Sequence, residues 1–363
     1  MKIDELLKVM ADNEASDLHV KADSPPVFRR DEVLYHLDIE PFNAARTREL
    51  ALEMMTEKQK AVFERVNEID LAYAPKGIGR FRVNVHSQRN TVALAIRRVS
   101  SRILTFEDLN LPKVLEKVSL MTSGFVLVTG TTSSGKSTTQ AAMIDYINRS
   151  RNCHVVTIED PIEFLHEDKQ AVVTQREVGI DTDSFVTAIK HVVRQDPDVI
   201  LIGEMRDAET FEAGVAASET GHLVISTLHT GDVMKSVDRL LDFFPPERHE
   251  QVRAILAINL RAITCQRLVP RADGNGLIPV VEVLIVTPGV VKLIRENRMN
   301  KIGSAIATGR EVGMQTFNQS LTDRYRANLI TMDDALANSS NPEALKMNLQ
   351  GIYLDEDRSI LTD

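Results

Sequence analysis

The chain has 363 residues, 43% of them hydrophobic and 26% charged, which is the ordinary balance of a globular protein long enough for two domains. Its formal net charge is −9, from 52 acidic and 43 basic residues, and this argues against nonspecific nucleic-acid binding, because contact with phosphates requires a basic patch. The two cysteines, Cys153 and Cys265, are too few for a disulfide framework or a zinc ribbon, and they predict small buried side chains in a reducing compartment.

The chain begins with charged residues and has no long apolar stretch there, so we expect no signal peptide. No apolar run anywhere is long enough to span a bilayer, and we expect a cytoplasmic protein.

The first hundred residues predict a small α+β domain. Apolar residues recur at helical spacing over 3–10, and residues 45–63 also have a helical period, whereas 18–20 predicts a short strand. The segments 80–86 and 92–96 alternate strictly, which is typical of paired strands with one polar face.

Residues 100–112 show no clear period and end in proline, so we interpret them as a linker between domains 1–99 and 113–363. Beyond this linker, apolar blocks alternate with helical stretches, which predicts an α/β fold with a doubly wound parallel sheet. The strand candidates are Phe125–Val128, His154–Ile158, Val199–Ile202 and Leu223–Ser226.

The C-terminal part of the second domain is predicted to be mainly helical from Glu247 onward. The exception is Leu277–Ile285, which resembles a hairpin strand after the turn at 273–276. The polar, acidic stretch beyond Ser339 is expected to be a loose end.

The segment 130–137 reads G-T-T-S-S-G-K-S, a complete phosphate-loop motif between an apolar strand block and a helix start. A helix N-terminus after a glycine-rich turn directs backbone N–H groups at one point, where Lys136 would reach the β- and γ-phosphates. The Ser137 hydroxyl would bind Mg²⁺. The alternative is a glycine-serine surface loop. The residues expected to hold the triphosphate of ATP are Gly130, Thr132, Ser133, Ser134, Gly135, Lys136, Ser137 and Thr138.

Three carboxylates follow the strand candidate at 154–158, namely Glu159, Asp160 and Glu163. Hydrolysis of ATP requires a carboxylate that orients the attacking water, and others that hold Mg²⁺ through its hydration shell. We assign the catalytic role to Glu163 and the water-mediated Mg²⁺ contact to Glu159; a solvated acidic turn is the alternative.

A buried strand over 199–202 ends at Glu204, the layout of a Walker B element with glutamate in place of the usual aspartate. Glu204 is therefore a candidate catalytic residue beside Lys136. A structural acid at the sheet edge is the alternative interpretation.

The segment 221–230 places His222 and His229 at the two ends of one strand, too far apart to share a metal ion. Each alone is more often a structural histidine. His229 follows the carboxyl end of the strand, where it could contact the γ-phosphate or an adjoining protomer.

Together these segments resemble a known family, the secretion-type ATPases of type IV pili and type II secretion. The matching motifs are T-I-E-D-P-I-E-F at 157–164, D-P-D-V-I-L-I-G-E-M-R-D at 196–207 and G-H-L-V-I-S-T-L-H-T at 221–230. The chain has neither the large extra N-terminal region nor the four-cysteine zinc motif usual in the assembly branch, so it resembles the retraction branch, the PilT/PilU family of twitching-motility proteins.

Within the retraction branch, V-V-K-L-I-R-E at 290–296 resembles a helix motif of these motors. Residues 176–185 and the extension beyond residue 340 favour the PilU-like members, whereas 203–207 and 226–230 look more PilT-like. We interpret the chain as PilU-like.

The resemblance implies a RecA-like P-loop ATPase domain behind a PAS-like N-terminal domain, in a homohexameric ring that hydrolyses ATP with Mg²⁺. Such a ring would power type IV pilus retraction and twitching motility from the cytoplasmic side of the inner membrane. Its partners would be an inner-membrane pilus platform protein and a paralogous retraction ATPase, with no nucleic acid.

Positive charge must also meet the transition state, and arginines on the N-terminal strands are the candidates, chiefly Arg82 and Arg97 beside Arg80 and Arg98. A solvated strand face explains alternating arginines equally well.

Two alternative functions remain open at this point. One is an accessory retraction subunit that depends on a second motor. The other is a RecA-like nucleic-acid translocase, which the acidic balance of the chain disfavours.

Overall fold

The computed structural model describes residues 1–30 and 33–350, which form two compact units. The first unit comprises Met1–Arg102 together with the short segment Glu163–Leu165, and the second comprises Ile103–Ile162 and the chain from His166 onward. Our domain limits of 1–99, 100–112 and 113–363 stay a prediction.

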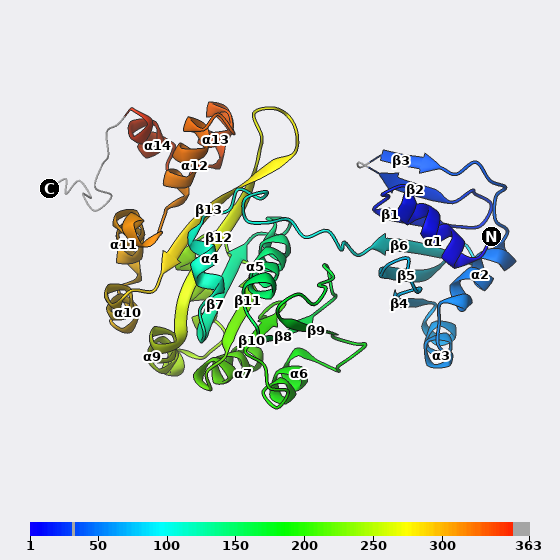
Figure 1. Cartoon of the computed structure of the whole chain (residues 1–363), viewed down its shortest axis with the longest axis horizontal. Helices are drawn as coiled ribbons and strands as arrows, with labels where there is room; N and C mark the ends of the chain where they lie inside the picture. The colour runs from blue at the N-terminus through cyan, green and yellow to red at the C-terminus, as the bar shows by residue number, and fades with distance from the viewer. Residues whose placement is uncertain (31–32, 351–363) are drawn as a thin grey trace. The chain divides into compact units, whose positions relative to one another are not determined.

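The first unit contains a six-stranded antiparallel sheet in the order β3-β2-β1-β6-β5-β4, with three helices (Figure 1). Its elements are α1 Ile3–Asp12, β1 Asp17–Val20, β2 Val27–Arg30, β3 Val33–His36, α2 Ala44–Glu53, α3 Glu57–Val66, β4 Glu68–Tyr73, β5 Phe81–Gln88 and β6 Thr91–Arg98.

Most of the predicted elements of the first unit are confirmed. The alternation over β5 buries Val83 and Val85 and leaves Arg82 exposed, as expected of a half-buried strand. The helix predicted over 45–63 is instead two helices, because α2 ends at Glu53 and the Thr56 side chain caps a new helix, α3. Strands β2, β3 and β4 were not predicted; all four residues of β3 are exposed, so no buried face marks it in the sequence.

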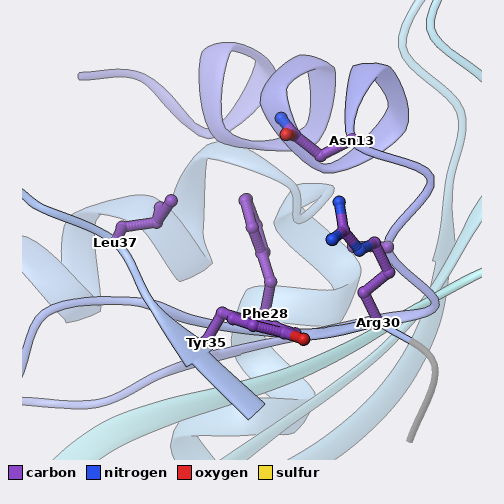
Figure 2. Close-up of a pocket in the computed structure, with 6 residues that line it drawn as sticks. Asn13, Phe28, Arg30, Tyr35 and Leu37 are labelled. Carbon is purple, nitrogen blue, oxygen red and sulfur yellow. The ribbon is translucent and has the colours of Figure 1, made fainter. Parts of the chain in front are cut away.

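A pocket of about 200 Å³ lies in the first unit beside the β2–β3 hairpin. Figure 2 shows Phe28 between Leu37 and Arg30, with Asn13 from the residues that follow α1. The Arg30 guanidinium lies 5.5 Å from the centre of the Tyr35 ring. This places a cation–π pair at the edge of an apolar pocket.

The second unit is built on a seven-stranded sheet in the order β13-β12-β7-β11-β10-β8-β9 (Figure 1). All neighbouring pairs are parallel except β12 with β13. The elements are α4 Val114–Ser119, β7 Gly124–Gly130, α5 Lys136–Ser150, β8 His154–Glu159, β9 Val172–Glu177, α6 Phe185–Val192, β10 Val199–Ile202, α7 Ala208–Glu219, β11 Leu223–Leu228, α8 Val233–Leu241, α9 His249–Asn259, β12 Leu260–Pro270, β13 Leu277–Ile285, α10 Pro288–Arg295, α11 Ile302–Thr308, α12 Phe317–Arg326, α13 Met332–Asn338 and α14 Pro342–Leu349.

Helices cover both faces of this sheet, each with its own apolar core. Residues of α4 and α5 pack with one face, which includes Val126 and Val128 of β7. Residues of α6, α7, α8 and α9 pack with the other face, which includes Phe125 and Leu127 of the same strand. Burial on both faces explains why the central strands are continuous apolar runs rather than alternating ones. The structure confirms the α/β class and the doubly wound arrangement.

The four strand candidates lie in β7, β8, β10 and β11, and β13 is the predicted hairpin strand. The expectation that the chain is mainly helical from Glu247 to the hairpin strand is wrong over Leu260–Pro270, because α9 ends at Asn259 and the chain continues as the 11-residue strand β12. The stretch beyond Ser339 was expected to be loose, but Pro342–Leu349 form the helix α14. Residues 351–363 of this stretch lie outside the described part of the chain.

Cys265 is buried, as predicted, and burial raises the pKa of its thiol to about 12; Cys153 is only partly buried. Within residues 1–30 and 33–350, no helix combines the length and hydropathy needed to cross a membrane.

The second unit should lose stability in mild acid through His166. Burial lowers the pKa of this imidazole from 6.5 to about 4, so the folded state binds fewer protons than the unfolded state between these values. Protonation of His166 therefore leaves the free energy of unfolding unchanged above pH 6.5. It lowers this free energy by up to about 3 kcal/mol as the pH falls to about 4. Urea unfolding of His166→Gln should show a weaker pH dependence than the wild type. Equal slopes for His166→Gln and the wild type would contradict the assignment.

Candidate nucleotide site

The site is defined by one edge of the large sheet. The parallel strands β7, β11, β10 and β8 are in register, so their carboxyl ends lie together. Backbone hydrogen bonds continue past the strand ends: the Gly203 N–H donates to the Ile158 carbonyl at 2.8 Å, and the Met205 N–H to the Thr227 carbonyl at 3.1 Å. The segment that follows β10 is thereby held beside the ends of β8 and β11.

The phosphate-loop motif leads from β7 into α5, as expected (Figure 1). Lys136 is buried, and its ammonium group donates to the carbonyls of Gly130 at 3.0 Å and Thr131 at 2.8 Å. The loop thus wraps around the Lys136 side chain. On nucleotide binding, phosphate oxygens would replace these two loop carbonyl oxygens as acceptors of the ammonium group.

Two glycines of the loop permit its close path. A Cβ built on Gly130 would lie 2.3 Å from Ser134 Oγ and 2.6 Å from the Gln266 carbonyl oxygen. Gly135 has a φ of +85° and caps α5. The buried Ser134 Oγ has no hydrogen-bond partner within the described chain. A tight loop with an unsatisfied hydroxyl group, at the N-terminus of a helix, suits a bound phosphate.

Ser137 and Thr138 follow in the first turn of α5 and are partly buried, whereas Thr132 and Ser133 are exposed on the loop. Ser133 has a φ of +60°, a strained conformation for serine that helps to close the turn. All eight predicted loop residues therefore lie in one strand–loop–helix segment.

Glu204 and His229 lie together after the ends of β10 and β11. His229 Nε2 is 3.7 Å from Glu204 Oε2, and Glu204 also forms an ion pair with Arg206. Burial lowers the pKa of His229 below its usual 6.5, and the charge of Lys136 lowers it further, so this histidine is neutral at pH 7. Lys136 is thus among the charges that act on His229, at the sheet edge where the loop begins.

Glu159 ends β8 at the same edge of the sheet. Its Oε1 accepts hydrogen bonds from Thr157 Oγ1 at 2.6 Å and Gln175 Nε2 at 3.2 Å, which fix the carboxylate. Asp207, three residues after Glu204, caps α7, because its Oδ1 accepts the Thr210 N–H at 2.8 Å.

The remaining predicted site residues belong to the first unit. Glu163 is exposed and begins the segment 163–165, in which the Leu165 N–H donates to the Ser100 carbonyl. Arg82 and Arg97 are exposed and directly opposite each other on β5 and β6, and Arg97 Nε is 2.7 Å from Asp17 Oδ1. The structure therefore does not unite these three with the loop inside one unit, and their roles stay proposals.

A pocket of about 250 Å³ adjoins the loop within the second unit, and it was not predicted. One wall is formed by Gly135, Thr138 and Thr139, and others by the 104–111 segment and by β12 and β13. The pocket was missed because the sequence places the linker residues and β12 far from the loop, and β12 was interpreted as helix.

Comparison with known proteins identifies the family. The family described as "Type II/IV secretion system protein" matches residues 1–311. A protein of Pseudomonas aeruginosa named "Type IV pilus ATPase PilU" is 42% identical over 350 residues, which cover 96% of this chain and 92% of that protein. "Type IV pilus retractation ATPase PilT" of the same organism is 42% identical over 343 residues, covering 94% and 99%.

Solved structures agree with these relatives. The crystal structure of "the Pilus Retraction Motor PilT and Bound ADP" superposes with a TM-score of 0.88 at 42% identity, and covers 95% of this chain and 99% of that one. The ATPase DotB of Legionella pneumophila follows with a TM-score of 0.73 at 25% identity, over 92% and 95%. The chain belongs to the type II/IV secretion system protein family. It is an ATPase with a RecA-like domain behind a smaller N-terminal domain.

The geometry of the loop predicts a selective effect of one added methyl group. Gly130→Ala should force Ser134 or β12 to move, and we expect at least about 10-fold weaker ADP binding, measured by isothermal titration calorimetry. Gly303, in α11, has open space around its Cβ position, so Gly303→Ala should leave ADP affinity unchanged. Equal ADP affinity of the two variants would contradict the tight path of the loop.

Proposed function

We propose that the chain is an ATP-driven motor that retracts type IV pili and thereby powers twitching motility. The observation that carries the proposal is that the phosphate loop, Glu204 and His229 lie at the same edge of the sheet. The chain that contains this arrangement is 42% identical, over nearly its full length, to a pilus retraction ATPase. The geometry supports cleavage of ATP, and the relatives support the work to which the cleavage is coupled.

Residues of the loop hold the triphosphate in this proposal. Gly130, Thr132, Ser133, Ser134, Gly135 and Thr138 surround the phosphates with N–H and hydroxyl groups, and Lys136 exchanges its two carbonyl partners for phosphate oxygens. The adjoining pocket receives the nucleoside, with Leu268 and Ile278 as apolar wall and Arg271 among the lining residues.

The residues present also fit a magnesium ion. Its ligands would be the Ser137 hydroxyl group directly and Glu159 through water, with the Glu159 carboxylate already oriented by Thr157 and Gln175. When bound, Mg²⁺ neutralises negative charge on the phosphate oxygens. Mg²⁺ bound to a nucleotide usually keeps several waters and takes its other ligands from phosphate oxygens, so few protein ligands are needed.

Two carboxylates have different tasks in the cleavage step. Glu204 lies beside His229 and takes part at the terminal phosphate, where neutral His229 can accept or donate a hydrogen bond. Glu163 polarises the attacking water. Its exposure leaves it available for this role once nucleotide is bound.

Arg82 and Arg97 supply positive charge to the transition state, together with their neighbours Arg80 and Arg98. Like charges directly opposite on adjacent strands destabilise a sheet, and Arg82 lies opposite Arg97. Asp17 offsets the charge of Arg97 through an ion pair. A bound phosphate would offset the charge of Arg82, which supports a role in nucleotide binding over that of a solvated strand face.

The subunits form a homohexameric ring on the cytoplasmic side of the inner membrane, where the ring acts on a pilus platform protein. Hydrolysis shifts one subunit against the next as a rigid body. The first unit corresponds to the PAS-like domain of this proposal.

A helper role beside a second retraction ATPase is a second candidate, because the chain is 42% identical to both PilU and PilT. These equal identities leave the PilU-like interpretation a prediction. The nucleic-acid translocase is disfavoured by the net charge of −9.

Lys136→Ala should abolish turnover, because the ammonium group is the cation nearest to the cleaved phosphates. We expect steady-state ATPase activity to fall at least about 100-fold with an unchanged circular dichroism spectrum, and cells that carry the variant should not retract pili. Lys190, which pairs with Glu209 on the surface, offers the matched control, since Lys190→Ala should keep full activity. Normal ATP turnover by Lys136→Ala would contradict the assignment of the nucleotide site to this loop.

Glu163→Gln should bind ATP with wild-type affinity and lose turnover at least about 100-fold, since an amide cannot act as a general base. Titration with a nonhydrolysable ATP analogue and the value of kcat separate the two effects. If turnover barely changes, Glu159 or Glu204 must orient the water.

A further inference from the structure

Gln266 is a buried polar residue for which neither the sequence motifs nor the proposed cleavage step gives a role. It lies on β12 directly opposite Gly130 on β7, and its side chain is turned beneath the phosphate loop. The side-chain amide bridges two parts of the loop segment: Nε2 donates to the Ser134 carbonyl at 2.7 Å, and Oε1 accepts from Thr139 Oγ1 at 2.7 Å. The Ser134 carbonyl can only accept, so it requires the Nε2 end of the amide, and the Thr139 hydroxyl group donates to the other end.

The bond to Ser134 controls the direction of the next N–H group. A peptide group is planar and trans, so the carbonyl of Ser134 and the N–H of Gly135 point in opposite directions. Because Gln266 holds that carbonyl toward β12, the Gly135 N–H points away from β12. Gly135 is the cap of α5, where backbone N–H groups have no intrahelical partner and are available to an anion.

The fit between Gln266 and the loop is close. A Cβ built on Gly135 would lie 2.7 Å from Gln266 Nε2, and the residue is only 3% exposed. The Gly135 carbonyl accepts the Thr139 N–H at 3.0 Å, which is the first hydrogen bond of α5. Gln266 therefore contacts the chain at the point where the helix begins. Gln266 holds the peptide between Ser134 and Gly135, and the first turn of the helix holds the next peptide, between Gly135 and Lys136.

We propose that Gln266 is a positioning residue that directs the Gly135 N–H at the β-phosphate of the bound nucleotide. This inference rests on the proposed function of the loop as the triphosphate site. Gln266 itself contacts the loop and not the phosphates. A preorganised donor loses no orientation entropy on binding, so the residue increases affinity for nucleotides with a β-phosphate.

The test compares nucleotides with and without a β-phosphate. Gln266→Met keeps the length of the side chain and removes both hydrogen bonds, and we expect about 10-fold weaker binding of ADP with unchanged binding of AMP. Both affinities can be measured by competition against a fluorescent ADP analogue. Gln315→Met is the matched control, because Gln315 Nε2 also donates to a backbone carbonyl at 2.7 Å, that of Val281, outside the loop.

The outcomes separate this inference from the proposed function. A wild-type protein that does not bind ADP contradicts the nucleotide site itself. If the wild type binds ADP and Gln266→Met binds it equally well, or loses ADP and AMP affinity to the same extent, Gln266 supports only the fold and the positioning role is overturned.

A second variant keeps the proposal testable if Gln266→Met does not fold. In Gln266→Glu the carboxylate cannot donate to the Ser134 carbonyl, whereas the protonated acid can, and burial raises the pKa of such a group. ADP affinity relative to the wild type should therefore recover as the pH falls from about 8 to about 6. A constant ratio over this range would contradict the positioning role.

Discussion

The backbone register of four parallel strands is the constraint on which the site depends. The motif residues are separated by up to a hundred positions along the chain, and they meet only because β7, β11, β10 and β8 end at one edge of the sheet. The hydrogen bonds from Gly203 to Ile158 and from Met205 to Thr227 extend this register beyond the strands. A change in the pairing of β10 by one residue would turn Glu204 away from His229.

The site combines rigid and responsive parts. The loop is fixed by glycines, by Lys136 and from below by β12, so that it presents its N–H groups in a set direction. By contrast, Glu204 has two partners that differ in charge, Arg206 and neutral His229. A negative γ-phosphate would compete with Glu204 for Arg206. Occupancy of the site can therefore change the contacts of Glu204 while the loop stays in place.

Much of the second unit could be predicted from the sequence, because its motifs are contiguous and its central strands are continuous apolar runs. The phosphate loop begins where β7 ends, Glu159 is the last residue of β8, and Glu204 lies two residues beyond β10, so each is at a strand end. The sequence did not reveal β12, since Leu260–Pro270 has no alternation and continues from a helix without a turn signal. Gln266 and the pocket beside the loop were lost with that strand, because both are products of tertiary pairing and have no local signature. The exposed edge strand β3 was missed for a similar reason, as a strand without a buried face leaves no periodic pattern.

The central claim is that Lys136, Glu204 and His229 surround one triphosphate. A structure of the protein with Mg²⁺ and a nonhydrolysable ATP analogue tests this claim most directly. We expect Lys136 to leave the carbonyls of Gly130 and Thr131 for the phosphate oxygens, with Glu204 and His229 facing the terminal phosphate. A triphosphate bound elsewhere, or one with Glu204 and His229 turned away from it, would contradict the assignment of the site.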